Sequence, residues 1–480
     1  MGAMTRTIDL WIDGEWAGAV GGATRPVVNP ATEVVESNLA IASVEDMLRA
    51  ADAAEAAFPA WSRSSPLERS DILRRTAKLL RERANEIARD ITLENGKTLT
   101  ESLAEVSWAG EFLDWFAEEG RRTYGRIVPA KTPGVRQSVT REAIGPVLAL
   151  SPWNWPLITA VKKISAALAA GCTVVLKPAE ETPSGAVHLA RAFADAGMPK
   201  GVFNLVFGDP DLISSTLIAA PQIKKVSFTG SVPVGRLLAE RAARVLKPVT
   251  LELGGHAPVI IFEDADVEAA VAKLVPIKFR TCGQVCSSPT RFFVHASIEK
   301  RFVELLSAAA AGLKVGNGLD AATQVGPVVS ARRLESVTRH VEDAVARGAK
   351  VATGGRRIGD TGFFYAPTIL TDVSDDAAIM TEEPFGPIVP VTSFSTYEEV
   401  VRRANAVDLG LAAYAFTRSL ETAQNISRDL ECGVVGINTL AVSTVEAPFG
   451  GVKDSGGGKE GGTEGIDTYL KTKFIVESVA

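Results

Sequence analysis

Residues 146–178 read PVLALSPWNWPLITAVKKISAALAAGCTVVLKP. The stretch opens on a short apolar run, continues with apolar residues at helical spacing from Pro156 to Ala170, and closes on a second apolar run, CTVVLKP. Short apolar runs on either side of a helical segment predict a β–α–β unit, in which a crossover helix joins two parallel strands. The stretch therefore predicts an α/β fold with helices packed on a parallel sheet.

The same alternation continues towards the carboxyl end. Apolar runs at 202–208, 224–230 and 248–255 predict three more strands, with helical segments between them. It resumes after Gly255 with PVIIF (258–262) and RFFVHA (291–296), which indicates a second α/β domain.

The flanking segments have other patterns. Residues 43–119 have the apolar spacing of helices, with Ser43 as a plausible N-cap. Residues 120–145 alternate apolar and polar positions and contain Gly and Pro, so we expect extended strands or a projecting hairpin there. The tail GIDTYLKTKFIVESVA (465–480) alternates like an edge strand.

Composition restricts the class of protein. The chain has 480 residues, of which 46% are hydrophobic and 22% are charged, and this balance is typical of a globular protein rather than a disordered one. At roughly 150 residues per domain, its length predicts about three domains, although two large domains would also fit. With 51 Lys+Arg against 57 Asp+Glu the net charge is −6, so we expect no nucleic-acid partner.

The counts of His and Cys restrict the chemistry. Four scattered His make a His-rich metal site or a Ser-His-Asp hydrolase improbable, so we expect no metal and a nucleophile or base drawn from Cys, Lys, Glu or Asp. Four Cys are too few for a disulfide framework, which favours a cytoplasmic location. The amino terminus has no signal-peptide core and no run approaches 18 apolar residues, so we expect no membrane partner.

Two residues are candidates for covalent chemistry. Cys286 ends GQVC (283–286), in a polar loop between a helix ending near Phe279 and a strand at Arg291, where a thiol can face a cleft. Glu252 ends an apolar strand in LELGG (251–255), where burial would raise its pKa towards that of a general base. The alternatives are a buried structural Cys and a solvated Glu at a strand end.

Three further segments follow strands. Gly230 and Ser231 join a strand to a helix, where backbone N–H groups can bind phosphate. Lys177 and Glu180 follow the second strand and could bind a ribose or a phosphate, although surface charge is an equal alternative. Asn154 offers an amide suited to an oxyanion, or it serves only the turn.

Together these segments resemble the aldehyde dehydrogenase superfamily, over essentially the whole chain. The motifs that carry the resemblance are PWNWP (152–156), KPAE (177–180), FTGS with Gly235, LELGG (251–255), GQVC (283–286), EEPFGP (382–387) and PFGG (448–451). The resemblance implies a Rossmann-like NAD-binding domain (1–120 and 144–254), an α/β catalytic domain (255–455) and a small β oligomerisation arm (121–143 and 456–480). It also implies a homodimer or a homotetramer.

The resemblance further implies roles for single residues. Cys286 is the expected nucleophile, Glu252 the base, and Asn154 the amide that binds the oxyanion together with the backbone N–H of Cys286. The residues implied to bind the cofactor are Trp153, Lys177, Glu180, Gly230, Ser231, Glu383 and Phe385. Because the carboxylate of Glu180 would repel a 2′-phosphate, we expect NAD, with NADP also possible.

For the substrate, the pattern is closest to succinate-semialdehyde and α-ketoglutaric semialdehyde dehydrogenases. Arg280 is expected to bind a distal carboxylate, with Lys162, Ser443, Thr444 and Phe449 in the same pocket. A structural ion pair at Arg280 is the alternative. Two other functions stay open from the residues alone: oxidation of neutral aliphatic or aromatic aldehydes, and a Cys-dependent acyltransferase or hydrolase that uses no nicotinamide.

Overall fold

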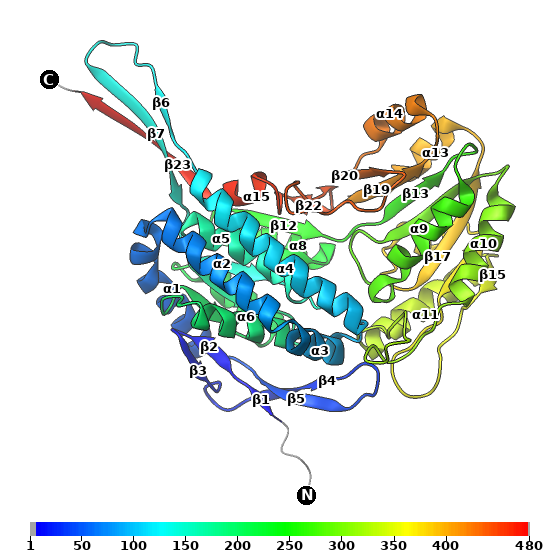
Figure 1. The fold of residues 1–480 in the computed structure, drawn as a ribbon, viewed down its shortest axis with the longest axis horizontal. Helices are drawn as coiled ribbons and strands as arrows, with labels where there is room; N and C mark the ends of the chain where they lie inside the picture. Colours follow the sequence, from blue (N-terminus) through cyan, green and yellow to red (C-terminus); the bar gives the residue numbers. More distant parts are fainter. Residues whose placement is uncertain (1–5, 479–480) are drawn as a thin grey trace, which may run out of the picture.

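The predicted α/β fold is confirmed in a computed structural model, which describes residues 6–478. Two lobes lie side by side, and a narrow arm projects from the first (Figure 1). Each lobe has its own sheet and its own apolar core.

The first lobe contains the apolar runs from which the fold was predicted. In spatial order its eight-stranded sheet consists of β22 (Gly456–Gly457), β12 (Val249–Leu253), β11 (Lys225–Gly230), β8 (Val147–Leu150), β9 (Val174–Lys177), β10 (Phe203–Leu205), β2 (Leu10–Ile12) and β3 (Glu15–Ala17). The five strands from β12 to β10 are parallel, and the outer strands pair antiparallel.

The strand order places a binding crevice. From β8 the chain adds β9 and β10 on one side and then β11 and β12 on the other, so the order reverses between β8 and β11. Ligands of open α/β sheets bind at such a reversal, beyond the carboxyl ends of the strands. The loop after β8 contains Asn154, and β11 ends at Gly230, directly before Ser231.

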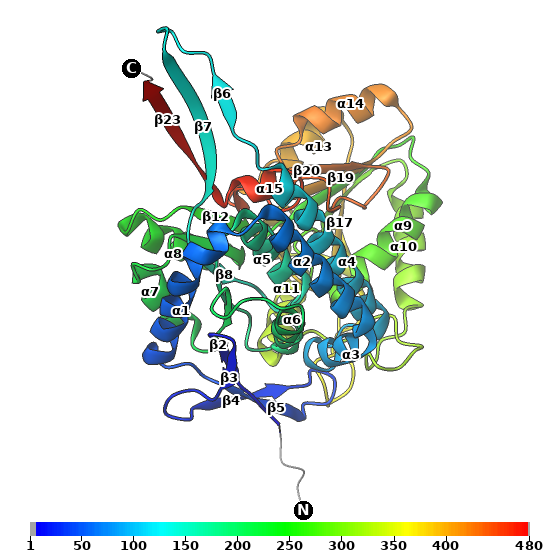
Figure 2. The same ribbon diagram turned by 60° about the vertical axis from the view of Figure 1, so that its left-hand side comes forward.

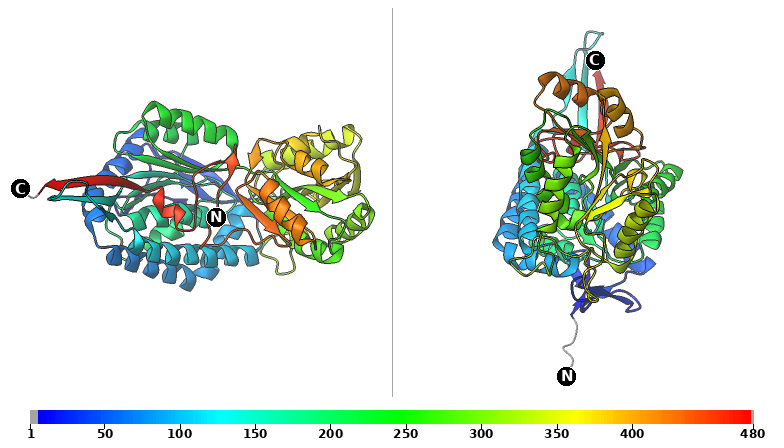
Figure 3. Two further views of the ribbon diagram at one scale, coloured as in Figure 1. Left: turned by 90° about the horizontal axis from the view of Figure 1, so that it is seen from above. Right: turned by 90° about the vertical axis from the view of Figure 1, so that its right-hand side faces the viewer.

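Helices cover both faces of this sheet, as the left panel of Figure 3 shows. Contacts place α1, α7 and α8 on one face, and α5 and α6 on the other, with α2 to α4 packed outside them. Ser43 is the N-cap of α1, as predicted. Their bounds are α1 (Val44–Arg63), α2 (Pro66–Glu82), α3 (Ala84–Asn95), α4 (Leu99–Glu119), α5 (Ile158–Ala170), α6 (Ser184–Asp195), α7 (Pro210–Ala219) and α8 (Val232–Arg244).

The second lobe is a separate α/β unit with a seven-stranded sheet. Its sheet runs β15 (Lys350–Thr353), β16 (Thr368–Thr371), β17 (Ile388–Phe394), β14 (Pro289–His295), β13 (Ala257–Ile261), β19 (Ala412–Phe416) and β20 (Val434–Ile437), and only β15 is antiparallel to its neighbour. Its helices are α9 (Val267–Phe279), α10 (Glu299–Ala311), α11 (Ala331–Ala346), α12 (Ala378–Thr381), α13 (Tyr397–Ala404) and α14 (Leu420–Asp429).

Two 3₁₀ turns occur among the described residues, η1 (Gly120–Arg122) after α4 and η2 (Arg280–Gly283) after α9.

The arm is an antiparallel sheet of three strands, which Figure 2 shows projecting beside the carboxyl terminus. It consists of β6 (Arg126–Val128), β7 (Val135–Ala143) and β23 (Leu470–Ser478), and β23 is an edge strand as the alternation predicted. The predicted boundary at 456 is wrong, because β22 pairs with β12 of the first lobe and α15 (Glu464–Asp467) precedes the arm.

Two small sheets complete the chain. One contains β1 (Thr7–Ile8), β5 (Val35–Ala40) and β4 (Thr24–Val28), and the other pairs β18 (Leu409–Gly410) with β21 (Val452–Lys453). Among residues 6–478, no helix has both the length and the apolar character needed to cross a bilayer.

Candidate active site

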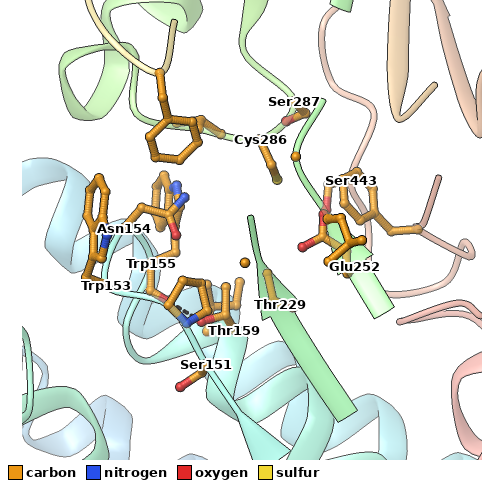
Figure 4. Close-up of a pocket in the computed structure, with 18 of the residues that line it drawn as sticks. Ser151, Trp153, Asn154, Trp155, Thr159, Thr229, Glu252, Cys286, Ser287 and Ser443 are labelled. Atoms are coloured by element: carbon orange, nitrogen blue, oxygen red, sulfur yellow. Dashed lines mark hydrogen bonds between the residues drawn. The ribbon is translucent and has the colours of Figure 1, made fainter. Parts of the chain in front are cut away.

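A cavity of about 860 Å³ lies where the two lobes meet, and residues of both lobes line it. Figure 4 shows the side chains of Asn154 and Glu252 on either side of the Cys286 thiol. Most of the residues that were predicted for the site line this cavity: Trp153, Asn154, Lys162, Gly230, Ser231, Glu252, Arg280, Cys286, Glu383, Phe385, Ser443 and Phe449.

Cys286 lies in a loop with an unusual backbone. Thr281, Cys282 and Gly283 all have positive φ values, of 50°, 56° and 73°, so the chain makes a left-handed turn directly after α9. A Cβ at Gly283 would lie 2.2 Å from the carbonyl oxygen of Gly386, so only glycine fits there. The turn brings the loop back towards the first lobe, where the sulfur reaches the cavity.

Buried Gln284 holds this loop in place. Its Nε2 donates to the carbonyl of Thr281 at 3.0 Å, and its Oε1 accepts from the backbone N–H of Val329 at 3.0 Å. Asn154 is joined to the same residue, because its Nδ2 donates to the Gln284 carbonyl at 3.0 Å. An amide nitrogen carries two hydrogens, so Asn154 keeps a second donor.

Glu252 is the penultimate residue of β12 and lies beside Thr229 of β11. Only 4% of the residue is exposed, and its Oε1 has no hydrogen-bond partner among the described residues. Burial raises the pKa of Glu252 to about 7, and the nearby charge of Glu460 adds to the rise. Burial, together with the charge of Glu252, also raises the pKa of the Cys286 thiol well above its ordinary value.

A second buried carboxylate, Glu460, was missed in the sequence. It pairs with Lys163 of α5, which also donates to the Thr229 hydroxyl. The available signal was Lys163 itself, a charge in the helical run VKKISAALAA, where an unpaired ammonium would be costly. The pair lies close enough to Glu252 for both charges to shift its pKa.

The cavity wall at α8 suits a dinucleotide. Ser231 is the N-cap of this 13-residue helix and makes no side-chain capping bond within the protein, and Gly230 and Ser231 both line the cavity. A helix N-terminus that begins at a turn is favourable for a pyrophosphate. This fits the predicted cofactor turn.

Glu383 and Phe385 approach the same cavity from the second lobe. Glu383 accepts from the backbone N–H of Gly255 at 3.3 Å, and burial raises its pKa to about 8. The Phe385 ring meets Trp153 edge-on, with the ring centroids 5.5 Å apart. A carboxylate beside an aromatic wall suits a ribose and a flat heterocycle.

Lys177 and Glu180 are not among the residues that line this cavity. They pair with each other, with Nζ 2.6 Å from Oε1, and Glu180 also accepts weakly from the backbone N–H of Gly208 at 3.4 Å. The negative charge of Glu180 is thus partly offset by Lys177, which weakens the repulsion that was expected against a 2′-phosphate.

Arg280 lines the substrate side of the cavity between two tryptophans. Its guanidinium carbon lies 5.1 Å from the Trp155 ring centroid and 5.6 Å from that of Trp108. Among residues 6–478 no carboxylate lies within 4.0 Å of Arg280, so a structural ion pair at that distance is excluded there. Neither tryptophan was predicted to contact it.

The other predicted substrate residues divide into two groups. Lys162 lines the cavity with its ammonium nitrogen 4.8 Å from the Phe449 ring centroid, and Ser443 is exposed at the mouth. Thr444 is exposed and does not line the cavity.

Comparisons with known proteins agree with this geometry. Residues 16–475 match the model of the aldehyde dehydrogenase family. A 4-(hydroxymethyl)benzenesulfonate dehydrogenase of Comamonas testosteroni is 45% identical, over 98% of this chain and 98% of its own. A succinate-semialdehyde dehydrogenase [NADP(+)] of Escherichia coli strain K12 is 42% identical, over 97% and 96%.

A solved structure gives the same result. The crystal structure of succinate-semialdehyde dehydrogenase from Burkholderia pseudomallei superposes with a TM-score of 0.97 at 42% identity, covering 98% of each chain. A family match over almost the whole chain, with these relatives, establishes an NAD(P)-dependent oxidoreductase. The chain therefore belongs to the aldehyde dehydrogenase family.

Proposed function

We propose that this enzyme oxidises an aldehyde that carries an anionic group, by way of a thioester on Cys286. The proposal of an anionic substrate rests on Arg280. Its guanidinium lines the cavity and has no carboxylate within 4.0 Å among residues 6–478. The charge of Glu101 acts on Arg280 only from beyond 4.0 Å, and a carboxylate or a sulfonate in the substrate would supply an anion in direct contact. The relatives named above act on compounds with one or the other group.

The first step needs a thiolate. Glu252, with a pKa of about 7, accepts the thiol proton of Cys286. The sulfur then attacks the aldehyde carbon, a C–S bond forms, and the carbonyl π electrons move to the oxygen. Asn154 donates to this oxyanion from its second amide hydrogen, together with the backbone N–H of Cys286.

The second step removes a hydride. As the oxyanion collapses back to a carbonyl, the carbon loses hydride and becomes a thioester of Cys286. When bound, NAD(P)⁺ would supply the acceptor for this hydride. The residues proposed to hold it are Gly230, Ser231, Glu383 and Phe385. Lys177 and Glu180 can also contribute while they are paired, because the ammonium keeps further donors and the carboxylate further acceptors for ribose hydroxyls.

Hydrolysis completes the turnover. Glu252 first gives up the thiol proton to solvent, and it then takes a proton from water while the hydroxide attacks the thioester carbon. The C–S bond breaks to release the acid and the Cys286 thiolate, which regains its proton from Glu252. A water-activating carboxylate favours hydrolysis over transfer of the acyl group to coenzyme A.

The anion proposal is tested with Arg280→Ala. We expect KM for succinate semialdehyde to rise by about 100-fold, since a charged hydrogen-bonded partner is lost, while KM for hexanal changes little. Steady-state reduction of NAD⁺ measures both aldehydes in one preparation, so hexanal controls for general damage. An equal rise for the two aldehydes refutes the role of Arg280.

Three finer expectations remain predictions. A preference for NAD over NADP is tested by the ratio of kcat/KM for the two cofactors, and a clear preference for NADP would refute it.

A cytoplasmic location agrees with four free cysteines. Assembly into a homodimer or a homotetramer is supported by the exposed apolar side chains on the arm, such as Phe474 and Ile127.

A further inference from the structure

A fully buried ion pair lies beside the segment that contains Asn154, and it takes no part in the catalytic steps described above. Lys97 precedes α4 and Glu105 lies within it, and their side chains meet with Nζ 2.7 Å from Oε2 at 0% exposure of both. Burial lowers the pKa of Lys97, although the charge of Glu105 opposes the shift. Removing two charges from water is expensive, so such a pair is weak evidence for a role in stability.

The pair is bonded to the segment that contains Asn154. The Lys97 ammonium donates to the backbone carbonyl of Asn154 at 2.7 Å and lies 3.9 Å from the Trp155 ring centroid. Its donors are therefore directed at Glu105, at the carbonyl and at the aromatic face. These contacts hold in place the backbone to which the Asn154 side chain is attached.

Glu105 holds the other end of the same segment. Its Oε1 accepts from the backbone N–H groups of Leu157 at 2.8 Å and Ile158 at 3.2 Å, where α5 begins. The N-cap position of α5, Leu157, has no side-chain capping bond of its own, and the first turn contains no acidic residue. Glu105 thus supplies the missing cap and complements the helix dipole from another helix.

The same face of α4 also reaches the cysteine loop. Glu101, four residues before Glu105, accepts from the backbone N–H of Thr281 at 2.7 Å. Residues four apart lie on one face of a helix, so one turn of α4 contacts both loops that flank the substrate carbonyl.

We propose that Lys97 and Glu105 are positioning residues that set the Asn154 amide for the oxyanion formed at Cys286. The inference rests on the proposed function, because it assumes that Asn154 stabilises that oxyanion. A displacement of about 1 Å from a site remote from the chemistry can lower a rate about 100-fold. The charges make the bonds directional, which an apolar pair of the same size could not do.

The test variant removes the charges of Lys97 and Glu105 and keeps both side chains close to their original size. Lys97→Met alone would leave Glu105 buried and unpaired, so the variant is Lys97→Met/Glu105→Gln, in which the Gln oxygen can still cap α5. Glu94→Gln is the matched control. Glu94 is also a buried carboxylate that caps a helix, accepting from the backbone N–H of Ser184 at 2.9 Å, but it does not line the cavity.

Three readouts separate positioning from damage. In the double variant we expect the pre-steady-state NADH burst to slow by about 100-fold, while NADH affinity and the rate of Cys286 alkylation by iodoacetamide stay within about twofold. Alkylation forms no oxyanion, so a displaced Asn154 does not affect it. In Glu94→Gln, we expect a wild-type burst even if the melting temperature falls.

The outcomes are distinct. A folded double variant with a wild-type burst overturns the positioning role, and so does a parallel loss of alkylation and burst. If the double variant does not fold, Glu105→Gln alone is measured in the same way, because burial lowers the pKa of Lys97 and lets the amine lose its charge once Glu105 is neutral. A slower burst with normal alkylation supports the role, and an unchanged burst overturns it. A wild-type enzyme that oxidises no aldehyde refutes the proposed function instead.

Discussion

At the scale of single residues, the central feature is a thiol beside a carboxyl group with both pKa values raised by burial. At rest the Cys286 sulfur is therefore protonated, and Glu252 titrates around neutrality. Since Oε1 of Glu252 has no partner among the described residues, it is free to take a proton from the thiol or from water. The pair can serve both the acylation and the hydrolysis of the thioester.

This pairing predicts a pH dependence. Protonated Glu252 cannot act as a base, so kcat should fall as the pH drops through about 7. Because the charge of Glu460 raises the pKa of Glu252, and that of Lys163 lowers it, Glu460→Gln should move the midpoint to lower pH. Steady-state kcat measured across the pH range tests this, and an identical midpoint in the variant would contradict it.

At the scale of elements, the position of α8 depends on its close approach to β12. A Cβ at Gly235 would lie 2.5 Å from Cδ2 of Leu253, so with a larger residue either the helix or the Leu253 side chain, which lines the cavity, must shift. The N-terminus of α8 lies at the cavity, where the pyrophosphate is proposed to bind. A displacement of the helix should therefore weaken cofactor binding.

Gly235→Ala tests this link. Overpacking should cost about 1–3 kcal/mol of stability and raise KM for NAD⁺ several-fold, with less effect on KM for the aldehyde. Gly457→Ala in β22 is the matched control, because a Cβ there meets nothing within 4 Å. Thermal melts and cofactor titrations of the two variants give the comparison. A change in KM of equal size in both variants would refute the role of the helix position.

Elements were predictable where a local pattern decides them. The apolar runs located β8, β9, β11 and β12, and the helix that was predicted to end near Phe279 is α9, which ends at that residue. Long-range contacts were not predictable. The pairing of β22 with β12 joins residues about two hundred positions apart, and nothing local distinguishes Gly456 from other loop glycines.

The residues of the site divide in the same way, into those that a local sequence pattern indicates and those that depend on long-range contacts. Cys286, Glu252 and Asn154 follow strand or helix signals and lie together at the cavity. Glu460 and the Lys97–Glu105 pair escaped prediction, because each is defined by a partner that is distant in sequence or in another element. Lys177 is the last residue of β9 and Glu180 lies in the loop after it, but the sequence does not reveal that they pair with each other.

At the scale of the whole molecule, two lobes with separate cores supply one cavity, and the arm points away from it. The arm exposes 58% of Phe474 and 72% of Ile127, which is unusual for large apolar side chains on a projecting sheet. A second copy of the chain would cover them.

Phe474→Asp tests the role of the arm in assembly. Burying a carboxylate in an apolar interface is costly, so we expect light scattering to show a smaller assembly than for the wild type. Lys471→Gln is the control, because it changes the charge by the same amount on the opposite face of β23. The prediction fails if Phe474→Asp keeps the wild-type mass, or if both variants lose it.

The most direct test of the central claim is mass spectrometry of Glu252→Gln after mixing with NAD⁺ and succinate semialdehyde. Without Glu252 the Cys286 thiol loses its proton only slowly, so the thioester should form more slowly than in the wild type but persist, because its hydrolysis also lacks a base. We therefore predict one succinyl group on the peptide that contains Cys286. Its amount should match a burst of NADH, and Cys286→Ala should show neither. NADH formation at the full steady-state rate in Glu252→Gln, or an acyl group on a residue other than Cys286, would contradict the account.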